Sequence, residues 1–289
     1  MSEPRRPAYP PKEHITRDLA PTIVRRDGQS TISIPVVSEI LDAAGFPRAG
    51  VFATIVDIVA GEYAIREVLP EWIATSNLSL QLDELPRAGT LHASPHILRR
   101  GRTTLVIEVD LFHSEAADAQ ANAAPSNLGI ATVGFSILPR RNDLQAGVHW
   151  AEEPDPLTTF ATKTSGFDKP ILDQIGLEGD PSDPATTRIA VQPHLLNTLG
   201  ALQGGIVALF LEAAGERFAA SLLEQPVRVR TLELHYLKLA RKGPIRAQAR
   251  SLGRIGTSLL VRVEVFDDGQ DGALIDVGTL TVDSAWNAS

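Results

Sequence analysis

Two segments of this sequence share a pattern that strongly limits the fold: a glycine, an apolar run with the length of a helix, and one acid inside that run. Asp57 follows Gly50 by seven residues, and Glu212 follows Gly205 by seven residues. An apolar run without a polar face predicts a helix that other elements enclose. Two further pairs share the offset of 155 residues that separates Gly50 from Gly205: Gly45 and Gly200, and Asp42 and Asn197.

A repeat of about 130 residues is too long for a solenoid unit and indicates a duplicated domain. With 289 residues, 43% of them hydrophobic, the chain is long enough for two ordinary cores. Proline and charge predict a disordered tail at residues 1–14, and a polar, proline-containing stretch predicts a linker at 141–166. The expected domains are therefore residues 15–140 and 167–289.

Alternation of apolar and polar residues predicts that antiparallel strands follow each long helix. Long helices are expected over residues 50–68 and 205–223, and a short helix is expected over 169–175. Strands of the first half are expected over residues 30–35, 73–82, 89–99, 103–112 and 128–138. Strands of the second half are expected over residues 186–192, 227–239, 245–252, 258–266 and 273–282. The expected fold class is α+β, with one long central helix and one antiparallel sheet in each half.

Composition and charge exclude several classes of function. The net charge of −8 and the lack of a basic block argue against nucleic acid as a partner. Without cysteine, disulfides, thiolate nucleophiles and cysteine metal sites are excluded. His92 and His96 have a metal-like spacing, but Pro95 interrupts their strand, so we prefer a solvated strand face and expect no metal. Because no apolar run approaches the length of a membrane span or signal region, we expect a cytoplasmic protein.

The lone acids and the glycines ahead of them indicate a candidate active site. A carboxylate in an apolar helix loses hydration, which raises its pKa and suits a general base. A single buried acid also fits a purely structural role. The first N–H groups of a helix have no internal partner, so a glycine start lets a ligand oxygen approach them and an oxyanion be stabilised there. Tight packing is the alternative role for these glycines.

The full pattern is Asn-x-x-Gly-x-x-(His/Gln)-Gly-Gly, followed by an acid seven residues after the last glycine. It resembles the signature of hotdog-fold acyl-CoA thioesterases of the phenylacetyl-CoA thioesterase and 4-hydroxybenzoyl-CoA thioesterase type. The second half matches this signature at six positions: Asn197, Gly200, Gln203, Gly204, Gly205 and Glu212. The first half keeps Gly45, Gly50 and Asp57 but carries Asp42, Arg48 and Ala49 at the remaining positions. Residues 171–178 are similar to the helix that precedes the motif in this family.

The resemblance implies a double hotdog, in which each active site combines the helix start of one half with the acid of the other. One composite site would contain Asp57, Thr75, Asn197, Gln203, Gly204 and Gly205, all as the family requires. The other would contain Glu212, Thr231, Asp42, Arg48 and Gly50, and its helix start has lost both the amide and the first glycine. We therefore expect one competent site and one degenerate site.

The implied activity is hydrolysis of an acyl-CoA to a free acid and CoA. The N–H groups of Gly204 and Gly205 would polarise the thioester carbonyl, while Asp57 activates water or attacks directly. Asn197 and Thr75 would orient the water and the acid. No metal or cofactor is required, because CoA enters as part of the substrate. Four arginines are candidates for binding the CoA phosphates: Arg99, Arg100 and Arg102 in one hairpin, and Arg254 in the other half.

Two rival functions remain open from the sequence. A hotdog hydratase or dehydratase acting on 3-hydroxyacyl or enoyl thioesters also uses an acid on the central helix, but normally pairs it with a histidine. No histidine lies near either helix start. A non-catalytic acyl-CoA binding protein is the other rival. A Ser-His-Asp hydrolase is disfavoured because the Gly-x-Ser-x-Gly elbow is missing. Two chains are expected to associate as a homo-oligomer, as relatives do.

Overall fold

The computed structural model describes residues 10–115, 126–139, 155–160 and 166–284. In the first half, four short elements precede a long helix: α1 (Ile15–Asp18), β1 (Thr22–Arg26), β2 (Gln29–Pro35) and η1 (Ser38–Ile40). The long helix α2 (Ala49–Val68) follows them. Four long strands come next: β3 (Trp72–Leu82), β4 (Thr90–Arg100), β5 (Thr104–Ser114) and β6 (Ser126–Leu138).

The second half has a similar order of elements. Five short elements come first: β7 (Leu157–Thr159), α4 (Ile171–Gln174), β8 (Glu178–Gly179), β9 (Thr186–Ile189) and η2 (Pro193–Leu195). The long helix α5 (Gly204–Leu223) follows them. Four strands and a short helical turn complete the described chain: β10 (Val227–Tyr236), β11 (Ile245–Ile255), β12 (Ser258–Asp267), η3 (Asp268–Gln270) and β13 (Ala273–Ser284).

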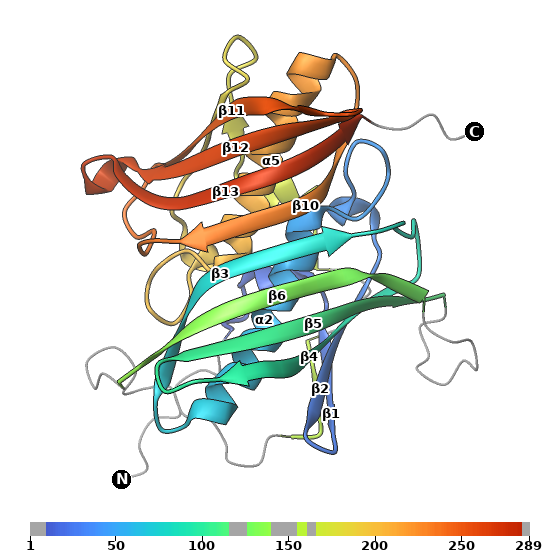
Figure 1. Cartoon of the computed structure of the whole chain (residues 1–289), viewed down its shortest axis with the longest axis vertical. Helices are drawn as coiled ribbons and strands as arrows, with labels where there is room; N and C mark the ends of the chain where they lie inside the picture. Colours follow the sequence, from blue (N-terminus) through green and yellow to red (C-terminus); the bar gives the residue numbers. More distant parts are fainter. Residues whose placement is uncertain (1–9, 116–125, 140–154, 161–165, 285–289) are drawn as a thin grey trace.

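Within the described residues, thirteen strands form one sheet in the order β7-β1-β2-β4-β5-β6-β3-β10-β13-β12-β11-β9-β8. The halves meet where β3 and β10 pair antiparallel, from Gln81 opposite Thr231 to Asn77 opposite His235. Figure 1 shows the long strands side by side as one twisted layer, with α2 and α5 on the same face of it. This arrangement confirms the expected α+β class.

Both long helices are buried because each has the sheet on one side and the other helix next to it. Helix α2 contacts β3, β4 and β6 as well as α5, and α5 contacts β10 to β13. Val51 and Ile55 on α2 and Leu209 on α5 are fully buried. Enclosure of this kind accounts for helices without a polar face. None of the helices in the described ranges is both long enough and apolar enough to cross a membrane.

The two helices approach each other closely at their first turns. A Cβ atom on Gly50 would lie 2.4 Å from Cα of Leu209, and one on Gly205 would lie 2.5 Å from Cα of Thr54. Since these distances are shorter than van der Waals contact, both positions require glycine. The two contacts are related by the same 155-residue offset, because it carries Gly50 to Gly205 and Thr54 to Leu209.

Most predicted elements are confirmed, with boundaries that differ by a few residues. Helices α2 and α5 begin one residue earlier than expected. Strand β10 ends at Tyr236 rather than at residue 239, because the N–H groups of Leu237 and Lys238 both donate to the carbonyl oxygen of Ile275. Strand β1 was not predicted, although Asp27-Gly28, with positive φ at both residues, is a strong hairpin signal.

The expected tail and linker lie partly outside the described residues. Residues 1–9 of the tail are outside, whereas residues 10–14 are placed on the protein. His14 is fully buried, and its Nε2 atom bonds to the carbonyl oxygen of Leu196 at 3.0 Å. Of the expected linker, residues 141–154 and 161–165 are outside. The segment between them contains β7, which pairs with β1 of the first half.

Candidate functional site

A hydrogen-bonded loop at residues 197–201 precedes helix α5. Its side-chain anchor is Asn197, whose Oδ1 atom accepts the backbone N–H groups of Leu199 (2.9 Å) and Ala201 (3.2 Å). Gly200 has a φ of +68°, a conformation that favours glycine. The sequence predicted that Asn197 would orient water and the acid. In the structure its hydrogen bonds are made within its own loop, so it shapes the approach to the helix.

The loop ahead of α2 has the same construction. Oδ1 of Asp42 accepts the backbone N–H groups of Ala44 (2.8 Å) and Phe46 (3.0 Å), and Gly45 has a φ of +81°. A carboxylate oxygen therefore does here what an amide oxygen does at residue 197. The donors correspond as well, because an offset of 155 residues carries Ala44 to Leu199 and Phe46 to Ala201.

The start of α5 brings its side-chain and backbone donors to an acid of the other half. Gln203 caps the helix, since its Oε1 atom accepts the N–H of Ile206 at 3.0 Å. Its Nε2 atom therefore faces away from the helix and donates to Oδ2 of Asp57 at 2.7 Å. The N–H of Gly205 also donates to Asp57. Among the described residues, no hydrogen bond from the N–H of Gly204 is found.

Asp57 lies in the middle of α2, and Thr75 of β3 provides a third hydrogen-bond donor to it. The hydroxyl of Thr75 donates to Oδ1 of Asp57 at 3.2 Å. Burial raises the pKa of Asp57 to about 6, and the hydrogen bonds from Thr75 and from the N–H of Gly205 oppose that rise. Near neutral pH the carboxyl is therefore mostly ionised but only weakly acidic. These are the properties of a general base.

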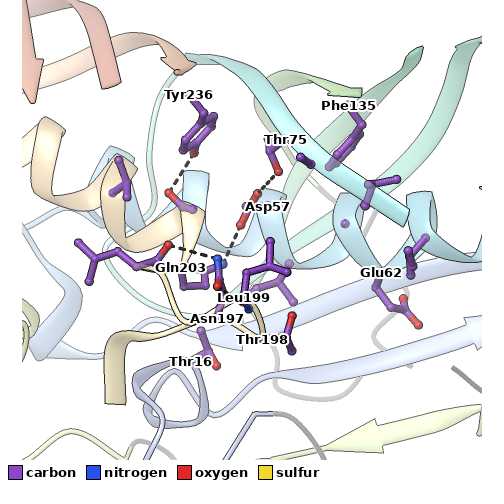
Figure 2. A pocket seen from close by; sticks show the side chains of 18 of the residues that line it. Thr16, Asp57, Glu62, Thr75, Phe135, Asn197, Thr198, Leu199, Gln203 and Tyr236 are labelled. Carbon is purple, nitrogen blue, oxygen red and sulfur yellow. Dashed lines mark hydrogen bonds between the residues drawn. The ribbon is translucent and has the colours of Figure 1, made fainter. Parts of the chain in front are cut away.

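The acid lies in the wall of a cavity of about 490 Å³. Figure 2 shows Asp57 between Thr75 and Gln203, with Asn197, Thr198 and Leu199 close by. Both halves of the chain contribute apolar side chains to the wall: Ile23, Ile58, Ile65, Trp72, Ile73 and Phe135 from the first, and Leu202, Val207, Leu239 and Ala240 from the second. A mostly apolar cavity with a few convergent polar groups is typical of a small-molecule site.

Several polar residues of this cavity were not predicted from the sequence. Tyr236, at the end of β10, donates its hydroxyl to the carbonyl oxygen of Gly204 at 2.9 Å. Glu62, on α2, pairs with Arg25 at 2.7 Å and with Arg66 at 2.8 Å. The place of Tyr236 depends on strand register, and the partner of Glu62 depends on β1, neither of which the sequence pattern fixes.

An ion-pair cluster occupies the second predicted site. NH1 of Arg48 lies 3.1 Å from both carboxylate oxygens of Glu212 and also bonds to Glu216. All three side chains are buried. Burial raises the pKa of both acids, and the guanidinium of Arg48 opposes that rise. Arg48 corresponds to Gln203 by the 155-residue offset, so both helix caps contact the acid of the other half, one through an amide and one through a cation.

Thr231 does not lie at the position that the sequence predicted for it. Its hydroxyl donates to Thr281 at 2.8 Å, rather than to an acid. A β-bulge falls between Thr75 and Asn77 in β3 and between Val229 and Thr231 in β10. Aligned on these bulges, Thr75 corresponds to Val229, so the pairing with Thr231 was wrong by two residues. The second site therefore has valine where the first has a hydroxyl donor.

The predicted phosphate-binding arginines lie away from the cavity wall. The residues that line the cavity in the described part of the chain do not include Arg99, Arg100, Arg102 or Arg254. Arg100 pairs instead with Glu67 near the end of α2 at 2.6 Å. The basic residues that do line the cavity are Arg25, which pairs with Glu62, and the exposed Lys238.

The two histidines with metal-like spacing have other partners. His92 bonds to the hydroxyls of Ser33 (2.7 Å) and Ser114 (2.9 Å) and stacks on Phe112. His96 lies beside two acids of β5, 3.1 Å from Glu108 and 3.6 Å from Asp110. Across the described ranges, no group of three or more His, Cys, Asp or Glu side chains is arranged to hold a metal ion.

Comparison with protein families gives a match over the part of the chain that contributes α5 to this site. Residues 199–273 match the thioesterase superfamily. This stretch begins in the loop ahead of α5 and ends at the first residue of β13. A search of curated proteins found no match to the sequence.

Solved structures resemble the chain over most of its length. A candidate thioesterase from Novosphingobium aromaticivorans has 16% identity and a TM-score of 0.60, over 91% of this chain and 98% of its own. An acyl-ACP thioesterase from Bacteroides thetaiotaomicron has 13% identity and a TM-score of 0.56, over 89% and 98%. A protein of unknown function with a hot dog fold from Alicyclobacillus acidocaldarius has 13% identity and a TM-score of 0.57, over 95% and 98%. The chain thus has the fold of hotdog proteins.

Proposed function

We propose that this protein hydrolyses an acyl-CoA thioester in one active site that both halves of the chain build. The observation that carries the proposal is the 2.7 Å hydrogen bond from Gln203, ahead of α5, to Asp57, on α2, in the wall of an apolar cavity. The thioesterase superfamily match over residues 199–273 supports the reaction class.

The chain is, in this proposal, a double hotdog with domains at about residues 15–140 and 167–289. Three observations support duplication. The loops ahead of α2 and α5 have the same hydrogen bonds. The glycines at the two helix starts make reciprocal close contacts. The caps of both helices reach the acid of the opposite half.

The start of α5 would hold the thioester carbonyl. The N–H of Gly204 is the donor that we assign to the carbonyl oxygen, since the N–H of Gly205 already donates to Asp57. As a water molecule attacks the carbonyl carbon, the oxygen gains negative charge. A backbone donor at a helix start stabilises that charge, by roughly 3 kcal/mol in comparable sites. Only one of the two glycine donors predicted from the sequence is therefore assigned to the oxyanion.

Asp57 would act as the general base. Its carboxylate removes a proton from the attacking water, and the new bond between water oxygen and carbonyl carbon gives a tetrahedral intermediate. When the intermediate collapses, the carbon–sulfur bond breaks and CoA leaves as a thiolate, which takes up the proton. Gln203 and Thr75 hold the two oxygens of Asp57, so the acid is preorganised before substrate binds. Asn197 acts indirectly by shaping the loop ahead of the helix.

The second composite site is proposed to be structural. Arg48 fills the space between the helix start and Glu212, and its positive charge neutralises the acid that would otherwise be a base. Valine stands where the first site has Thr75. With the three charged side chains buried, a substrate carbonyl has no access to this helix start.

The competing dehydratase function has less support. No histidine is found among the described residues that line the cavity. A carboxylate whose pKa is raised toward neutral pH and one backbone donor suffice for hydrolysis, because a thiolate is a good leaving group.

Incubation with a panel of acyl-CoAs of different chain length tests the proposal. We expect release of free CoA thiol together with the free acid, and loss of both products in the Asp57→Asn variant. Because one similar structure is an acyl-ACP thioesterase, the panel includes the same acyl groups on acyl carrier protein. Formation of an enoyl thioester without thiol release would instead identify a dehydratase. Cleavage of acyl carrier protein substrates alone would contradict the assignment to CoA.

A further inference from the structure

Asp276, on β13, is a buried acid that the reaction proposed above does not use. It lies directly opposite Tyr236 of β10 in the sheet, and both residues line the same cavity as Asp57. The residue is 1% exposed. Within the part of the chain that the structure describes, neither of its carboxyl oxygens has a hydrogen-bond partner.

A nearby aspartate shows how this fold satisfies a buried acid that has a structural role. Asp267, on β12, is also fully buried, and its carboxylate accepts the backbone N–H groups of Arg241, Lys242 and Gly243 at 2.8 to 3.0 Å. Asp276 has no such set of donors. A buried polar group without a partner destabilises a fold, so its presence in a cavity wall calls for a ligand that completes its hydrogen bonds.

The position of Asp276 relative to the proposed reacting centre is set by Tyr236. The hydroxyl of Tyr236 donates to the carbonyl oxygen of Gly204, the residue whose N–H we assign to the substrate carbonyl. Burial raises the pKa of Tyr236, and the carboxyls of Asp57 and Asp276 raise it further, so both acids lie near that hydroxyl. Asp276 and Asp57 thus both lie near the Tyr236 hydroxyl and line one cavity.

The wall of the cavity is mostly apolar, and the second half contributes Leu202, Val207 and Ala240 to it. Burial raises the pKa of Asp276 well above its ordinary value. The neutral carboxyl has one O–H donor and one carbonyl acceptor. A hydroxyl group has one donor and two acceptor lone pairs, so it can complete both hydrogen bonds at once. A plain alkyl chain can complete neither.

We propose that Asp276 is a specificity-determining residue, and that the cavity selects acyl thioesters whose acyl group carries a hydroxyl that hydrogen-bonds to this carboxyl. The inference rests on the proposed thioesterase function, because it places the acyl group in the cavity beside Asp57. It adds the chemical class of the acyl group, which the position of the catalytic acid alone does not define.

Matched pairs of CoA thioesters test this inference. Each pair has one chain length, with and without a single hydroxyl, and the hydroxyl is moved along the chain. For the wild-type protein we expect kcat/KM to be at least about tenfold higher for the hydroxylated member at one position. Asp276→Leu, which keeps the branched shape but removes both polar atoms, should abolish that preference, largely through KM. Asp276→Asn retains a donor and an acceptor and should keep part of it.

Thermal unfolding separates a ligand-binding role from a structural one. Replacement of an unpartnered buried acid by leucine should leave the melting temperature unchanged or raise it. No preference for a hydroxylated acyl group at any position would overturn the inference. It would also be overturned by a preference that survives in Asp276→Leu, or by a fall in melting temperature in both variants.

Failure of the proposed function would be seen separately. In that case no thioester, with or without a hydroxyl, releases thiol. The same pairs are then compared by calorimetric binding to the wild-type protein and to Asp276→Leu. Tighter binding of the hydroxylated member to the wild type alone supports the assignment to Asp276, and equal binding of both members overturns it.

Discussion

The side-chain amide of Gln203 donates a 2.7 Å hydrogen bond to Oδ2 of Asp57, a residue 146 positions earlier in the chain. The acid belongs to the helix of one half, and the amide caps the helix of the other half. A side chain that both caps a helix and holds an acid couples the packing of the two helices to the chemistry of the site.

The activity should depend on one ionisation near pH 6. Because the carboxylate of Asp57 is the active form and burial raises its pKa to about 6, kcat/KM should fall as the pH is lowered through that value. Above it, the rate should reach a plateau. Asp57→Asn should lower kcat/KM roughly a hundredfold or more and remove this ionisation from the residual profile. A wild-type profile that stays flat from pH 5 to 8 would exclude Asp57 as the base.

Gln203→Met should move the pH profile upward. The amide stabilises the ionised form of Asp57, so its removal should raise the midpoint by about one pH unit. The same change removes the helix cap and should lower the free energy of unfolding by about 1 kcal/mol. Gln203→Glu keeps the length of the side chain but places a second carboxyl beside Asp57, so it should raise the midpoint further. An unchanged midpoint in Gln203→Met would show that the amide does not act on the acid.

The glycines at the helix crossing should not tolerate alanine. A methyl group on Gly50 or Gly205 would overlap the backbone of the neighbouring helix, so either substitution should destabilise the protein by about 1–3 kcal/mol or more. Gly61→Ala is the matched control. It also lies on α2, and a Cβ there meets nothing within 4 Å. It should stabilise the protein by about 0.5–1 kcal/mol, as measured by chemical denaturation.

Arg48→Met should destabilise the protein without removing the proposed active site. The change leaves Glu212 and Glu216 buried without a cation, which should cost about 3–5 kcal/mol. Because burial already raises the pKa of both acids, the loss should be largest at alkaline pH and should shrink as they are protonated at lower pH. Adding Glu212→Gln and Glu216→Gln to Arg48→Met should restore much of the stability. A loss that does not vary with pH would contradict the ion-pair assignment.

Much of the site follows from short-range spacing in the sequence. The seven residues from Gly50 to Asp57 and from Gly205 to Glu212 set the position of each acid on its helix, whatever the rest of the fold. The association of Asp57 with Gln203 was expected from the family resemblance, and the structure places the two side chains in contact. Local hydrogen bonds then keep the geometry of each loop and cap.

The remaining features depend on how distant strands align. Thr231 was misplaced because the equivalent bulges of β3 and β10 match Thr75 to Val229, and no pattern in the sequence marks where these bulges fall. Asp276 and Tyr236 come together only through the register of β10 against β13. Strand β1 was overlooked because its alternation is short, although it brings Arg25 to Glu62 in the cavity wall.

The most direct test of a single active site shared by both halves is thiol release by two matched variants. Asp57→Asn and Glu212→Gln each replace a helix acid by its amide, at positions related by the 155-residue offset. Both are measured with the acyl-CoA that the wild type cleaves best, and the rates are normalised to folded protein. The asymmetric site predicts loss of thiol release in Asp57→Asn and near wild-type release in Glu212→Gln. Equal loss in both variants would contradict it.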